Sequence, residues 1–162
     1  MLPYWMKKKK KKKDNDPDLF PRPVVKKSRS NLVARLDKVF ALYIRLRDVM
    51  PSGYGRCISC GKIKPFNELD CGHFHGRTHM GTRWEEDNCN AECKVCNRMS
   101  ADHIIGYRDN LIAKIGMSRY DTLKLKAKCP KHWLDSELQE KIDYYRKEVK
   151  RLSAEKGIRV NL

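Results

Sequence analysis

The sequence lacks any long apolar segment. No apolar run approaches the roughly 20 residues that a membrane-spanning helix needs. The segment Met1 to Met6 is too short for the core of a secretory signal peptide, and lysines follow it where small residues are expected. Acidic residues are also few, at 20 against 36 lysines and arginines. We therefore expect a cytoplasmic protein that does not contact the membrane.

The deficit of acidic residues leaves a net charge of +16, which predicts a polyanionic partner, and nucleic acid is the usual one. Residues 1–30 carry 11 basic and 3 acidic side chains, and residues 31–162 carry 25 and 17. A lysine tract binds the DNA backbone without reading sequence, so the tract predicts a DNA tether. The alternative is a solubilising tail. The tract comprises Lys7, Lys8, Lys9, Lys10, Lys11, Lys12 and Lys13.

Seven cysteines are an odd number, and four of them form two Cys-x-x-Cys pairs. This spacing favours a metal site in a reducing compartment over a disulfide framework. Two such pairs can complete a tetrahedron around one Zn²⁺, and a closed set of four thiolates is typical of structural zinc. The predicted zinc ligands are Cys57, Cys60, Cys93 and Cys96.

The composition divides the chain into four parts. Repelling lysines and prolines predict a disordered tail over residues 1–29. We expect an N-terminal helix within 30–53, a zinc-bound core over 54–100 and a helical region over 101–157. The predicted fold class is α+β, with a zinc-stapled core that is surrounded by helices.

Apolar spacing locates the helices. The first should begin near Ser30 or Asn31 and end before Pro51, with one buried face. That face comprises Leu32, Leu36, Val39, Phe40 and Tyr43. The last helix should follow a capping box, Ser136 to Gln139. Its apolar stripe predicts either a face that docks on the domain or a short coiled-coil dimer. That stripe comprises Leu138, Ile142, Tyr145, Val149 and Leu152.

Between these helices, short strands are expected over 56–58 and 69–74, and a helix should start at the second cysteine pair. Another helix is predicted over 102–115, with Gly116 as its stop and a further helix after it. We expect its inward residues to be Ile104, Ile105, Leu111, Ile112 and Ile115.

Three residues of the predicted core, His73, Asn88 and Asn97, suit phosphodiester hydrolysis. His73 is the candidate general base, since a neutral imidazole accepts a proton near pH 7. The Asn88 amide can both donate and accept, so it can fix the loop that carries His73. Asn97 follows the last zinc ligand, so its carbonyl oxygen can be held as a hard ligand for Mg²⁺ or Mn²⁺.

The order of these residues resembles an HNH (His-Me finger) endonuclease with Asn in place of the final His. Several segments are similar to the NinG/Rap family of phage recombination endonucleases, over roughly residues 30–155. They are Leu36–Phe40, Cys57–Gly61, Gly72–Phe74, Arg83–Asn88, Cys93–Asn97 and Tyr107–Gly116.

The resemblance implies a ββα-metal, treble-clef-like core. It also implies a protein of a bacterial or phage-infected cell. The implied activity is divalent-metal-dependent cleavage of branched DNA, such as Holliday junctions and D-loops. It assigns His73 as the base, Asn88 as the middle asparagine and Asn97 as a metal-binding residue. One departure is Gly72, which stands where many such sites have a second metal ligand. That ligand is left open: Asp70, His75 or a carboxylate within 85–87 can serve.

Other residues have two interpretations. Arg77 and Arg83 predict contacts with DNA phosphates, or else surface ion pairs. We expect Cys71 and Cys89 to be buried and His103 to face solvent. The rival functions are a zinc-finger module that binds DNA without cleaving it and a scaffold in a recombination complex. A homodimer would allow symmetric cuts across a junction.

Overall fold

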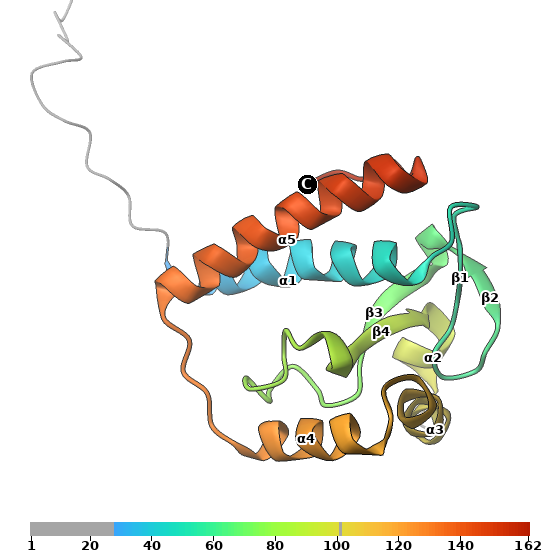
Figure 1. The fold of residues 1–162 in the computed structure, drawn as a ribbon, viewed down its shortest axis with the longest axis horizontal. Helices are drawn as coiled ribbons and strands as arrows, with labels where there is room; N and C mark the ends of the chain where they lie inside the picture. Colours follow the sequence, from blue (N-terminus) through green and yellow to red (C-terminus); the bar gives the residue numbers. More distant parts are fainter. Residues whose placement is uncertain (1–27, 101) are drawn as a thin grey trace, which may run out of the picture.

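The computed structural model describes residues 28–100 and 102–162, so the lysine tract and residues 1–27 of the predicted tail lie outside the described residues. The described part is mixed, with five α-helices and two two-stranded antiparallel sheets. One sheet lies between a helical layer formed by α1 (Arg29–Asp48) and α5 (Asp135–Lys156) and a second helical region that contains α4 (Met117–Lys128) (Figure 1). The predicted α+β class is therefore correct at this level.

Helices α1 and α5 lie side by side along most of their lengths (Figure 1). All five predicted inward residues of α1 are buried, and so are all five of the predicted α5 stripe. Aromatic rings join the helices, with Phe40 and Tyr145 at 4.9 Å between centroids in an edge-to-face arrangement. The α5 stripe is thus covered by α1, which confirms a docking face within the chain and leaves that stripe unavailable for a coiled-coil dimer.

The central sheet pairs β3 (Leu69–His73) with β4 (Cys89–Cys93), so that Asp70 lies opposite Glu92 and His73 opposite Cys89. A smaller sheet pairs β1 (Tyr54–Arg56) with β2 (Ile63–Pro65). The strand expected over 56–58 is wrong in extent. It stops at Arg56 because the first cysteine pair forms a turn, in which the Gly61 N–H donates to the Cys57 carbonyl.

The two faces of the β3–β4 sheet differ in chemistry, since side chains alternate along a strand. Cys71 and Cys89 belong to the apolar cluster formed with α1 and α5. On the other face, the Tyr107 hydroxyl from α3 (His103–Ile115) donates to the Gly72 carbonyl at 3.0 Å. A Cβ at Gly72 would lie 2.2 Å from a carboxylate oxygen of Glu92, so glycine is required there by close packing.

Short helices complete the fold. Helix α2 (Lys94–Met99) starts within the second cysteine pair, as predicted, and two 3₁₀ turns cover Phe66–Glu68 and Glu86–Asn88. Gly116 ends α3 with a φ of 79°, which favours glycine. Helix α5 begins at Asp135, before the predicted capping box. The N-terminal cap is Leu134, whose N–H donates to the Glu137 carboxylate at 2.6 Å.

Two expected inward residues of α3 are wrong. Ile104 and Ile105 are 39% and 58% exposed. Leu111 is fully buried, as predicted, and it forms a cluster with residues of α4 and with Tyr107, which the periodicity did not predict. Ile112 and Ile115 pack at its edge, as expected. Within the described residues, no helix is long and apolar enough to span a membrane.

The α1–α5 contact predicts a stability effect. Ile142 is fully buried in it, so Ile142→Ala should lower the free energy of unfolding by about 2–5 kcal/mol through lost burial and a cavity. Urea denaturation measures the change. Lys147→Ala, at an exposed position of the same helix, is the control and should change stability by less than about 0.5 kcal/mol. Equal effects of the two substitutions would contradict the assigned packing.

Candidate functional site

The four predicted zinc ligands come together. The sulfurs of the four cysteines all lie within 4.8 Å of one another, and those of Cys60 and Cys93 are 4.0 Å apart. Zn–S bonds of about 2.3 Å in a tetrahedron place sulfurs about 3.8 Å apart, so the cluster is the right size for one zinc ion. The donor set of Cys57, Cys60, Cys93 and Cys96 therefore fits the metal that the sequence predicted.

The local backbone explains why these sulfurs converge. Cys57 accepts the Gly61 N–H and donates to the Lys62 carbonyl, which closes the turn between β1 and β2. The Cys93 N–H, at the start of α2, donates to the Cys57 sulfur at 3.3 Å. An ion bound here would link the β1–β2 turn to the junction of β4 and α2, and so would fix the position of α2.

Helix α2 brings Asn97 to Asp70. The Asn97 amide donates to an Asp70 carboxylate oxygen at 3.1 Å, and the exposed Arg98 makes a bidentate pair with the same carboxylate at 2.7 and 3.0 Å. Burial raises the pKa of Asp70, but the hydrogen bonds from Arg98 and Asn97 outweigh it, so the pKa is lowered and the carboxylate is charged at neutral pH. Of the alternatives for the second metal ligand, Asp70 is the one that contacts Asn97.

Asn88 fixes the loop that follows His73. Its side chain is fully buried, accepts the His75 N–H at 2.8 Å and donates to the His75 carbonyl at 2.9 Å. It also donates to the Thr82 carbonyl at 3.0 Å. Both ends of the loop are therefore tied to one amide, which is the positioning role that the sequence suggested for Asn88.

His75 lies in this loop, with its ring against Phe74 and His79. The remaining candidates for the second ligand are engaged elsewhere. Glu85 pairs with Lys126, Glu86 accepts from Tyr43, and Asp87 pairs with Arg119.

His73 lies on the other face of the sheet from Asp70 and Asn97, because it shares the strand parity of Cys71. Its two ring nitrogens are each 3.2 Å from a backbone carbonyl oxygen, one of Cys71 and one of Arg83. Burial, and then the charge of Arg77, lower the pKa of His73, so the ring is neutral at pH 7. A neutral imidazole has one proton, so one of these nitrogens presents a lone pair. The structure thus separates the predicted base from the predicted metal ligand.

The two predicted DNA-binding arginines differ in environment. Arg83 makes a bidentate pair with Asp37 of α1 at 2.6 and 3.0 Å, and Asp37 also accepts from Trp84. The ion-pair partner of Arg83 is therefore an aspartate of α1, and not one of the acidic residues at 85–87. Arg77 is exposed, and its carbonyl accepts from Arg83.

The sequence reasoning missed a buried carboxylate. Glu92 is completely buried, and one of its oxygens accepts from the Ser59 hydroxyl at 2.5 Å and lies 2.7 Å from a His103 ring nitrogen. Its other oxygen has no hydrogen-bond partner among the described residues. His103 was expected to face solvent, which is wrong, because it packs against Glu92. Strand alternation from Asp70 across the sheet is the signal that would have found Glu92 on the α2 face.

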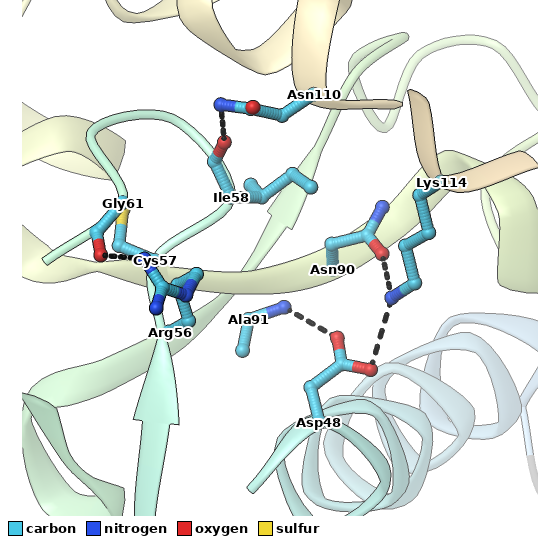
Figure 2. A pocket seen from close by; sticks show the side chains of 9 residues that line it. All are labelled: Asp48, Arg56, Cys57, Ile58, Gly61, Asn90, Ala91, Asn110 and Lys114. Carbon is cyan, nitrogen blue, oxygen red and sulfur yellow. Dashed lines mark hydrogen bonds and ion pairs between the residues drawn. The ribbon is translucent and has the colours of Figure 1, made fainter. Parts of the chain in front are cut away.

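A pocket of about 350 Å³ opens beside the four-cysteine cluster, between the β1–β2 turn, β4 and α3 (Figure 2). Inside it, Lys114 donates to Asn90 at 2.6 Å and to Asp48 at 3.2 Å. Asp48 in turn accepts the Ala91 N–H, and Asn110 donates to the Ile58 carbonyl. The polar groups in this pocket mainly bind one another, so they tie α1 and α3 to the cysteine turn.

Comparison with known proteins identifies the family. The model of the family described as NinG, bacteriophage lambda NinG protein, matches residues 5–155 of this chain. The chain belongs to the NinG family. Two NinG proteins, from Salmonella phage P22 and Escherichia phage lambda, are each 31% identical to it over 107 residues, which is 64% of this chain. The matched region is 49% and 48% of their lengths, so the chain spans about half of these NinG relatives. No solved structure matches.

The cysteine cluster predicts metal-dependent folding of this NinG protein. Cys96→Ser should weaken zinc binding and lower the melting temperature, because three thiolates remain and α2 loses its attachment. Metal analysis after gel filtration and thermal denaturation measure both effects. Cys129→Ser is the matched control, since Cys129 is exposed and belongs to neither metal-capable group of the described residues. Identical zinc content in the two variants would contradict the assignment.

Proposed function

We propose that this NinG-family protein is a metal-dependent DNA endonuclease of the HNH type that acts on branched recombination DNA. The observation that carries the proposal is the contact between Asp70 of β3 and Asn97 of α2, next to the cysteine cluster. A charged carboxylate and an amide side by side are the hard oxygen donors that Mg²⁺ and Mn²⁺ prefer. The order of β3, β4 and α2 also matches the ββα arrangement expected of such an enzyme.

Each residue has a proposed role. Asp70 and the amide oxygen of Asn97 would hold the catalytic cation, which supplies positive charge to the scissile phosphate and the leaving oxygen when bound. Arg98 already pairs with Asp70 at the surface and can pass to a phosphate oxygen when DNA binds. Asn88 positions the loop after His73. His73, whose ring is neutral, is the proposed base that accepts the proton of the attacking water.

The substrate class rests on charge and on the family. The net charge of +16 favours the closely spaced phosphates of nucleic acid, and binding through phosphates reads no sequence. Junctions are more open and deformable than linear duplex, so a protein can select them by shape. We therefore expect weak sequence preference and cleavage of four-way junctions or D-loops. A homodimer on a junction would cut two strands symmetrically.

One observation favours a second candidate function, a zinc-dependent DNA-binding protein without catalysis. His73 and the Asp70–Asn97 pair lie on opposite faces of one sheet, and both His73 nitrogens face backbone carbonyls. His103, held by buried Glu92, is the histidine on the Asp70 face, so it is the alternative base if cleavage does not depend on His73.

The decisive experiment compares cleavage of a four-way junction and its matched linear duplex, with and without Mg²⁺. His73→Ala should bind junction DNA as wild type does but cleave it at least about 100-fold more slowly, which is the usual effect of losing a general base. His103→Ala is the matched histidine control and should retain cleavage. Normal activity of His73→Ala with loss in His103→Ala would move the base to His103. Binding by wild type without any product in Mg²⁺ or Mn²⁺ would favour the non-catalytic candidate.

The cation site makes a separate prediction. Asp70→Asn keeps the size of the side chain but removes its charge, so half-maximal cleavage should need at least about tenfold more Mg²⁺. Titration of the metal in the junction assay measures the change. Asp143→Asn, on the exposed side of α5, is the control for a lost carboxylate. An unchanged metal requirement in Asp70→Asn would exclude Asp70 as a ligand.

A further inference from the structure

A second group of metal-ligating side chains lies on the α1 face of the central sheet. Ligand atoms of Cys71, His73 and Cys89 all lie within 4.8 Å of one another. The three residues converge because His73 is the cross-strand partner of Cys89, and Cys71 is two residues earlier on the same face of β3. They are separate from the four-cysteine cluster, which forms between the β1–β2 turn, the end of β4 and α2.

The surroundings of this group are closed. Cys89 is fully buried and Cys71 is 6% exposed, within the apolar cluster of α1 and α5. The Arg83 carbonyl oxygen lies 3.2 Å from a ring nitrogen of His73 and 3.8 Å from the Cys89 sulfur. Two sulfurs, one imidazole nitrogen and one carbonyl oxygen are thus gathered at one place, and both cysteines are free of disulfide bonds.

Two thiolates and an imidazole are a donor set for zinc and for softer ions, and a poor one for magnesium. We propose that Cys71, His73 and Cys89 form a second metal site, which binds one Zn²⁺ or Cd²⁺ ion with the Arg83 carbonyl as the nearest fourth donor. Binding releases the two thiol protons to solvent and forms two metal–sulfur bonds and one metal–nitrogen bond. The site therefore takes a thiophilic cation, and not the hard cation proposed for Asp70 and Asn97.

The site has a consequence for activity, which rests on the proposed function. An ion held by His73 occupies the lone pair that the proposed base needs. Zinc or cadmium beyond the first equivalent should therefore inhibit cleavage, although it leaves the structural cluster and the Asp70–Asn97 pair unchanged. The chain would then be inhibited by excess thiophilic metal at a buried site.

Cadmium titration of the reduced full chain tests the site without an activity assay. Wild type should bind two Cd²⁺ ions and develop the ultraviolet charge-transfer absorbance of six thiolates, because six cysteines lie in the two groups. The variant Cys71→Ala/Cys89→Val should bind one ion, with the absorbance of four thiolates. Circular dichroism checks its fold, and if it fails to fold, Cys71→Ala alone should give the absorbance of five thiolates.

A histidine variant and the metal stoichiometry distinguish failure of the second site from failure of the proposed function. His73→Asn should keep the first ion but weaken binding of the second by at least about tenfold. One Cd²⁺ per wild-type chain at excess metal, or equal absorbance in wild type and the cysteine variants, would overturn the second site. Two ions in wild type and one in the double variant would establish the site even if no DNA is cleaved, in which case only the proposed function fails.

Discussion

The four-cysteine cluster joins three segments of the chain, namely the β1–β2 turn, the end of β4 and the start of α2. The β1–β2 sheet has three residues in each strand, and the β3–β4 sheet has five. Sheets of two short strands are marginal in water without further support. A metal ion that joined the β1–β2 turn to the start of α2 would supply binding free energy that is also folding free energy. It would also support the position of α2, whose Asn97 contacts Asp70.

The central sheet serves two different environments because its side chains alternate. The face with Cys71 and Cys89 packs under α1 and α5, where apolar burial stabilises the fold. The face with Asp70 and Glu92 meets α2 and α3. There the Asp70 carboxylate accepts from Asn97 and Arg98, and one oxygen of Glu92 contacts Ser59 and His103. This division explains why one short strand carries both a hard oxygen donor and a thiol-rich group, although only two residues separate Asp70 from His73.

The same division separates the two proposed metal sites, the oxygen donors of Asp70 and Asn97 and the sulfur donors of Cys71 and Cys89. Oxygen donors lie at the wetter edge, next to exposed Arg98, where a hydrated magnesium ion and a DNA phosphate can approach. Sulfur donors lie in the dry layer, where water competes least for a thiophilic ion. If His73 acts as the base, its place beside the two thiols makes it sensitive to such ions. The Asn88 amide holds the adjoining loop through its hydrogen bonds to His75 and Thr82.

The sequence by itself determined the local features. The spacing within each cysteine pair predicted the four-cysteine cluster, and apolar periodicity predicted the buried faces of α1 and α5, because both patterns depend on residues close together in the chain. The role of Asn88 in holding the loop was also predictable from its amide chemistry. The tertiary structure decided what depends on pairing between distant segments. The register of β3 with β4 put Glu92 beside Asp70 and Cys89 beside His73, α2 brought Asn97 into contact with Asp70, and α1 supplied Asp37 to Arg83. Neither spacing nor composition encodes that register, because it is set by how the whole chain packs around the two faces of the sheet.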